Sequence, residues 1–260
     1  MLDTLQYLLG AGSGVLVGFV LGLVGVGGSI LAVPLMVYLV GVPSPHMAIG
    51  TSALAVAVNA LTSLLTHLRQ GTVKWRCASV FGAAGIAGAF AGSSAGKAVD
   101  GQRLLFLFAL VMIAVGNVML RNRKREGDPS VVLGRENAPK LVGYGFGTGL
   151  FSGFFGIGGG FLIVPGLVAA TGMPMINAVG SSLVAVSAFG LTTAANYAFS
   201  GLVDWGLAAV FIAGGVAGGF LGARLAKRLS DTRGRLTTIF AALIFVVAVY
   251  MLWKSGTAVL

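Results

Sequence analysis

Residues 24–34 read VGVGGSILAVP, and residues 155–165 read FGIGGGFLIVP. Both stretches follow the pattern Gly-x-Gly-Gly-(Ser/Gly)-x4-Pro, and both lie inside long apolar segments. Glycine weakens a helix and proline removes one of its hydrogen bonds, so such a cluster interrupts a helix that apolar residues would otherwise continue. Each stretch therefore predicts two helical legs that meet at the glycines and form a hairpin.

The similarity between the two halves continues beyond the glycines. Gly50-Thr51-Ser52 corresponds to Gly180-Ser181-Ser182, and the segment from Gly71 to Trp75 corresponds to the segment from Gly201 to Trp205. A match of this length indicates an internal duplication of the kind found in many transporters. We therefore divide the chain into a first membrane repeat at residues 1–120, a charged cytoplasmic linker at residues 121–140 and a second membrane repeat at residues 141–260.

The composition places these repeats in a membrane. Hydrophobic residues make up 57% of the chain and charged residues 9%, whereas soluble domains carry about 25% charge. Since about 18 to 20 apolar residues cross a bilayer, long uncharged runs predict membrane-spanning helices. Such runs occupy residues 4–68, 77–96, 104–120, 141–203, 205–223 and 236–253.

The basic residues indicate how each glycine-interrupted segment is threaded. The chain carries 17 Lys and Arg against 7 Asp and Glu, and basic residues in short loops favour the cytoplasmic side. If each segment is a hairpin that returns to its starting face, Lys97, Arg103 and Lys254 are the basic residues left outside. Two plain crossings per segment would instead divide the basic residues almost evenly. The sequence therefore predicts an all-α polytopic membrane protein of two inverted repeats, each a broken-helix hairpin plus three transmembrane helices. This placement of the positive charge also argues against nucleic-acid binding.

The glycine breaks are candidate anion-binding sites. A helix that begins after a break presents unpaired N–H groups and the positive end of its dipole. We expect the anion to contact Gly25, Gly27, Gly28, Ser29, Gly156, Gly158, Gly159 and Gly160. Close helix packing is the alternative role for these residues, and it is the expected role of Gly82, Gly85, Gly88, Gly92, Gly215, Gly218 and Gly222. Pro34 and Pro165 are expected to act as hinges or helix breaks that keep the second legs short.

Polar side chains behind the hairpins could complete the site. The hydroxyl groups of Thr51, Ser52, Ser181 and Ser182 could donate to an anion, although helix capping or back-bonding is the alternative. His67 and Arg69 are candidate residues of the inner mouth, with interfacial anchoring as the alternative. Weaker polar candidates lie deeper in these spans, with hydrogen bonding between helices as the alternative: Asn59, Thr62, Thr192, Thr193 and Asn196. We expect Gly28→Leu and Gly159→Leu to abolish anion flux while leaving the fold intact.

Several kinds of chemistry lack the residues they need. No Asp or Glu lies within a predicted span, although buried carboxylates are the usual relays for protons and sodium. An inside-negative potential by itself favours anion exit, by about 2.3 kcal/mol per charge per 100 mV. No His, Cys, Asp and Glu cluster has metal-ligand spacing, and no nucleophile has a partner base. We therefore expect a transporter without metal or cofactor rather than an enzyme.

These motifs resemble the TauE/SafE sulfite exporter family over almost the whole chain. The resemblance rests on the doubled glycine block, the Gly-(Thr/Ser)-Ser that follows it and the Gly-x-Val-x-Trp at Gly71 and Gly201. It implies a multi-pass permease of the bacterial inner (plasma) membrane for sulfite or a small organosulfur anion. Two positions depart from strict repetition: Ser29 replaces the third glycine seen at Gly160, and Phe189 stands where the first repeat has Asn59.

The function that we expect is export of sulfite or a similar anion by alternating access. Two alternatives remain open at this point. The first is an ion-coupled importer of thiosulfate or another organosulfur anion, and the second is a membrane scaffold subunit without transport activity. The expected partners are the small anion and the lipid bilayer, and the sequence leaves a homo-oligomer open.

Overall fold

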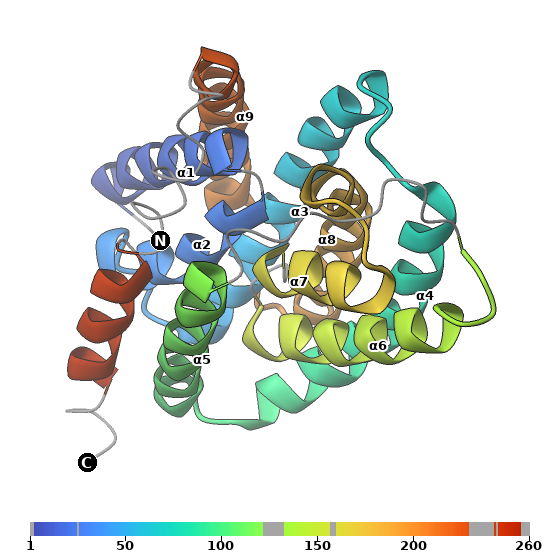
Figure 1. Cartoon of the computed structure of the whole chain (residues 1–260). Coiled ribbons are helices and arrows are strands. Elements are labelled where there is room, and N and C mark those ends of the chain that lie inside the picture. The colour runs from blue at the N-terminus through green and yellow to red at the C-terminus, as the bar shows by residue number, and fades with distance from the viewer. Residues whose placement is uncertain are drawn as a thin grey trace.

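The computed structural model describes residues 3–24, 26–121, 133–156, 160–228, 242 and 244–255. Across these ranges the chain is helical and contains no strand (Figure 1). The elements are α1 (Thr4–Val24), η1 (Val26–Leu31), α2 (Ala32–Pro34), η2 (Leu35–Leu39), α3 (Pro45–Arg69), α4 (Trp75–Ala98), α5 (Gly101–Arg121), α6 (Ala138–Phe155), α7 (Gly160–Thr171), α8 (Met175–Ala198), α9 (Trp205–Arg228) and a C-terminal helix, Ile244–Ser255.

The predicted all-α polytopic architecture is confirmed. Five helical segments of the described chain are long and apolar enough to cross a membrane: Thr4–Gly22, Pro45–Arg69, Trp75–Ala98, Met175–Ala198 and Trp205–Gly222. The predicted linker is bounded by helices, since α5 ends at Arg121 and α6 begins at Ala138. Residues 122–132 of this linker lie outside the described residues.

Both predicted helix interruptions are present at the glycine blocks. In the first repeat α1 ends at Val24 and the 3-10 helix η1 begins at Val26. In the second repeat α6 ends at Phe155, Gly156 takes a left-handed conformation with φ of 67°, and α7 begins at Gly160. The helical pattern is therefore broken at corresponding positions of the two repeats.

The second legs of the two hairpins differ from each other. The leg of the first repeat passes from 3-10 to α to π geometry, and Pro34 is the last residue before the π-helical segment. The leg of the second repeat is a single α-helix that continues through Pro165 to Thr171. Pro165 therefore does not end its helix, and its role as a hinge stays a prediction.

The broken helix of each repeat packs against a long helix of the other repeat. α1 runs parallel to α9, where a Cβ on Gly14 would overlap the carbonyl oxygen of Phe211. α6 runs parallel to α4 in the same way, where a Cβ on Gly149 would overlap the carbonyl oxygen of Gly85. Small residues allow such close backbone approach in membrane helices. Each repeat thus completes its core with a helix from its counterpart.

Glycines predicted to serve packing mostly do so. A Cβ on Gly85, Gly88, Gly92, Gly215 or Gly218 would overlap a neighbouring helix or side chain. Gly82 is also buried, but a Cβ there would meet nothing within 4 Å, so close packing does not require glycine at this position.

The central helices α3 and α8 lie side by side and run antiparallel (Figure 1). The turn after α3 contacts the beginning of α8, where Asn177 Nδ2 donates to the carbonyl oxygen of Thr72 at 2.9 Å. The turn after α8 contacts the beginning of α3, where a Cβ on Gly50 would overlap the carbonyl oxygen of Leu202. The orientation of the two whole repeats relative to the membrane stays a prediction.

Candidate functional site

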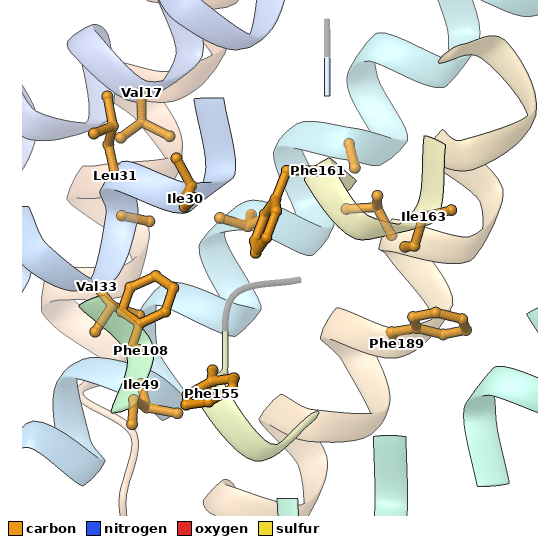
Figure 2. Close-up of a cluster of buried hydrophobic side chains, with 14 of the residues drawn as sticks. Val17, Ile30, Leu31, Val33, Ile49, Phe108, Phe155, Phe161, Ile163 and Phe189 are labelled. Carbon is orange, nitrogen blue, oxygen red and sulfur yellow. The ribbon is translucent and has the colours of Figure 1, made fainter. Parts of the chain in front are cut away.

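The two helix breaks approach each other inside the bundle. η1 of the first repeat contacts α7 of the second, and Figure 2 shows Ile30 of η1 and Phe161 of α7 in one apolar cluster. Ile49, Phe108 and Phe155 belong to the same cluster and are buried. Apolar surroundings strengthen electrostatic interactions because they lower the local dielectric constant. The second legs of both hairpins therefore begin in a region where a polarised backbone acts strongly.

The predicted glycine ligands have different surroundings. Gly28 lies in η1 against the backbone of α1, where a Cβ would come within 2.6 Å of Leu21 N and 2.8 Å of Val17 O. The expectation that Gly28→Leu leaves the fold intact is therefore wrong, because a leucine would push η1 away from α1. Gly156 faces the side chain of Ile49, immediately before the Gly50-Thr51-Ser52 motif.

The remaining residues of the two glycine blocks are placed in part. Gly27 and Ser29 belong to η1, and Ser29 is fully buried. Gly160 is buried as the first residue of α7. Gly25, Gly158 and Gly159 lie outside the described residues. Anion binding at these positions stays a prediction.

The Gly-(Thr/Ser)-Ser motif of each repeat docks onto the Gly-x-Val-x-Trp motif of the other repeat. Thr51 Oγ1 accepts a hydrogen bond from the backbone N–H of Asp204 at 3.0 Å, immediately before α9. Ser181 Oγ accepts the corresponding hydrogen bond from the N–H of Lys74 at 2.8 Å, immediately before α4. In both cases a hydroxyl on a central helix satisfies an N–H at the start of a helix of the other repeat.

Glycine is required in both partners of this docking. Gly71 and Gly201 have φ values of 66° and 68°, which favour glycine, and they turn the chain toward α4 and α9. A Cβ on Gly180 would come within 3.2 Å of the carbonyl carbon of Thr72, so the turn can reach Ser181. The sequence shows both motifs twice but not that they pair, since their residues are far apart along the chain.

The four candidate hydroxyl donors divide into two kinds. Ser52 Oγ donates to Ile49 O at 3.1 Å, and Ser182 Oγ donates to Val179 O at 2.7 Å, so the protons of both hydroxyls are used within their own helices. Thr51 and Ser181 use their oxygens as acceptors, and their hydroxyl protons have no acceptor among the described residues. All four residues are fully buried. Thr51 and Ser181 are therefore the better candidate donors to a ligand.

Removing the docking hydrogen bonds should lower stability. We expect Thr51→Val or Ser181→Ala to cost about 1 kcal/mol each, because the N–H of Asp204 or of Lys74 loses this hydrogen bond. Thermal unfolding of purified protein in mild detergent measures the change. Thr192→Val is the matched control, because Thr192 Oγ1 only donates to Ala188 O of its own helix at 2.8 Å. Equal midpoints for Thr51→Val and Thr192→Val would contradict a stabilising role for the docking.

The candidate mouth residues lie at the end of α3. His67 Nδ1 is 2.9 Å from Thr72 Oγ1, in the turn that docks onto α8, and Arg69 is exposed at the last position of α3. The hydrogen bond gives His67 a structural partner. An attraction of anions by His67 and Arg69 stays a prediction.

A cluster around Lys97 was missed by the sequence analysis, which counted this residue only among the basic residues left outside. Lys97 Nζ donates to Asn196 O at 3.0 Å, to Asn196 Oδ1 at 2.9 Å and to Ser200 Oγ at 2.9 Å. Asn196 Nδ2 in turn donates to Ser93 Oγ at 2.6 Å. The cluster joins the end of α4 to the end of α8, and Lys97 also lines an open cavity of about 570 Å³ with His46 and Asp100. The signal in the sequence that could have indicated this cluster was a lysine and an asparagine near the ends of apolar helices.

Known proteins place this architecture in a transporter family. A family model described as sulfite exporter TauE/SafE matches residues 10–251. A probable membrane transporter protein of Xylella fastidiosa (strain Temecula1) is 54% identical over 94% of both chains. The probable membrane transporter protein YunE of Bacillus subtilis is 27% identical over 83% of this chain and 87% of its own length.

More distant similarity extends to archaea. The probable membrane transporter protein MJ0441 of Methanocaldococcus jannaschii is 27% identical over 65% of both chains. No solved structure matches the chain. The doubled glycine block, the docked motifs and the match over most of the chain lead to one conclusion: this protein is a multi-pass membrane transporter that belongs to the TauE/SafE sulfite exporter family.

Proposed function

We propose that the protein exports sulfite or a similar small sulfur-containing anion across the bacterial inner membrane. The observation that carries the proposal is the approach of η1 to α7 within an apolar cluster. Each of these segments begins a second leg, and unpaired N–H groups at the start of a helix favour a negative charge. Two such starts close together suit one small anion.

The polar groups around this region support the same proposal. The anion would contact the hydroxyl protons of Thr51 and Ser181 and the backbone of the two glycine blocks, at Gly25, Gly27, Gly28, Ser29, Gly156, Gly158, Gly159 and Gly160. The apolar side chains of Ile30 and Phe161 would exclude water from it. Ser52 and Ser182 would contribute only if they released the carbonyl groups of Ile49 and Val179.

The packing of helices in pairs suggests how alternating access would work. Each broken helix moves with the long helix of the other repeat on which it packs, so the pair α1 and α9 and the pair α4 and α6 behave as two bodies. Their relative rocking would open the breaks to one side of the membrane at a time. Export needs no coupling ion, since an inside-negative potential drives an anion outward.

A flux panel in proteoliposomes tests the substrate and the direction. Sulfite, thiosulfate, sulfate and sulfoacetate are loaded separately, with and without proton or sodium gradients and with an imposed membrane potential. We expect sulfite efflux at least about tenfold above protein-free liposomes, faster when the receiving side is positive. Thr51→Val should lower this flux per folded molecule, whereas Thr51→Ser should restore it. Uptake that depends on a proton or sodium gradient would replace the exporter with a coupled importer, and no flux of any of the four anions would reject transport of these substrates.

A further inference from the structure

Asn59 is an unusual side chain for the middle of a membrane helix. It lies near the centre of α3 and is 2% exposed. Neither its Nδ2 nor its Oδ1 has a hydrogen-bond partner among the described residues. The hydroxyl groups of Thr62 and Ser63 bond only the backbone carbonyl of Asn59, at 2.8 and 3.0 Å, and leave the amide itself unpaired. A buried amide without partners costs free energy, so its presence requires an explanation.

The corresponding position of the second repeat shows that packing does not require an amide. Phe189 occupies that position, is fully buried and stacks on Phe81 with ring centroids 6.3 Å apart. Phe189 covers Gly85 of α4, just as Asn59 covers Gly215 of α9, where a Cβ would lie 2.6 Å from Asn59 Cγ. The same site in the fold is therefore filled by hydrocarbon in one repeat and by an amide in the other.

The amide of Asn59 faces the helix pair that leads into the first helix break. Gly215, which it covers, contacts Gly18 of α1. Val17, the residue before Gly18, contacts Gly28 of η1 through its carbonyl oxygen, which would lie 2.8 Å from a Cβ on that glycine. The unpaired amide therefore faces the pair of α1 and α9, and η1 packs on α1 of this pair.

We propose that Asn59 hydrogen-bonds the transported anion and that the preferred anion is monoprotonated. This inference rests on the proposed function and adds a specificity-determining residue to it. An amide offers one donor group and one acceptor, and both are unpaired at Asn59. A fully ionised oxyanion such as sulfate can only accept hydrogen bonds, and would leave Oδ1 unpaired. Hydrogen sulfite carries both acceptor oxygens and a proton to donate, so it can satisfy Nδ2 and Oδ1 together.

Asn59→Leu separates this role from a structural one. The substitution keeps the number and branching of the side-chain heavy atoms and removes both unpaired polar atoms, so we expect the thermal midpoint to stay the same or rise. The KM for sulfite should rise about tenfold or more, the loss expected for hydrogen bonds to a charged ligand. Thr62→Val is the matched control, since it removes a hydroxyl one turn away that bonds only the helix backbone. It should change neither quantity.

Further measurements distinguish a failure of this inference from a failure of the proposed export function. KM for total sulfite in the wild-type protein should be lower on the acidic side of the second ionisation of sulfite than on its alkaline side. An unchanged KM for sulfite in Asn59→Leu, whatever its thermal midpoint, would overturn the role of Asn59 and would leave the proposed export of sulfite standing. A wild-type KM that does not depend on protonation would overturn the monoprotonated substrate. If the wild-type protein carries none of the sulfur anions, the proposed function falls and this inference falls with it.

Discussion

Gly149→Leu is expected to abolish the folded protein, whereas Gly147→Leu on the same helix should be tolerated. A Cβ on Gly149 would overlap the carbonyl oxygen of Gly85 and lie 2.7 Å from its Cα, so α4 would have to move away from α6. A Cβ on Gly147 would meet nothing within 4 Å. Overpacking in a core costs about 1–3 kcal/mol, and a clash with backbone cannot be relieved by a change of rotamer.

The loss should appear as a missing monodisperse peak when solubilised membranes are passed over a size-exclusion column. The first repeat supplies an independent copy of the experiment, because Gly14 of α1 faces the carbonyl oxygen of Phe211 and Gly12 faces nothing within 4 Å. Gly14→Leu should therefore fail and Gly12→Leu should succeed. Similar yields for the members of either pair would mean that the glycines do not set the helix separation.

Cysteines at Arg69 and Phe199 should react with an impermeant reagent from opposite sides of the membrane. The two positions correspond to each other in the repeats. Arg69 is the last residue of α3, and Phe199 is the first residue after α8. The two helices are central and pack antiparallel. Phe199 is 92% exposed, and Arg69 is also exposed. The expected difference is all or none, because a charged maleimide does not cross the bilayer.

The labelling requires a background without the native thiol. Cys77 is buried, and Cys77→Ala removes its residual reactivity. Position 199 is preferable to the nearby position 204, because Asp204 Oδ1 accepts a hydrogen bond from the N–H of Leu207 at 2.8 Å in the first turn of α9. Reaction of both cysteines from the same side of intact cells would disprove the inverted orientation of the repeats.

The sequence predicted the features that depend on local backbone chemistry. Helix breaks at the glycine blocks were predictable because glycine and proline act on the residues next to them. Close packing at Gly85 and Gly215 was predictable because small residues at helical spacing form a stripe. The uncharged runs predicted the spans formed by α3, α4, α8 and α9 for the same reason, since length and composition decide whether a helix can cross a bilayer.

Features that depend on contacts between distant segments were not predicted. The hydrogen bonds of Thr51 and Ser181 join different repeats, and the sequence around either residue does not indicate its partner. The cluster around Lys97 joins the ends of α4 and α8 in the same way. The π-helical segment Leu35–Leu39 also lacks a local signal beyond the proline that precedes it. Tertiary packing decides these features, so local sequence patterns do not predict them.

The exchange of helices between repeats has a consequence for how the chain is made. α1 ends at Val24, but α9, the helix on which it packs, begins only at Trp205. During translation α1 enters the membrane early. It remains in contact with lipid, without its packing partner α9, until most of the polypeptide has been synthesised. Chaperones or the insertion machinery would encounter a first half with an exposed glycine stripe, and a ribosome that stalls between the repeats would release a product that cannot mature.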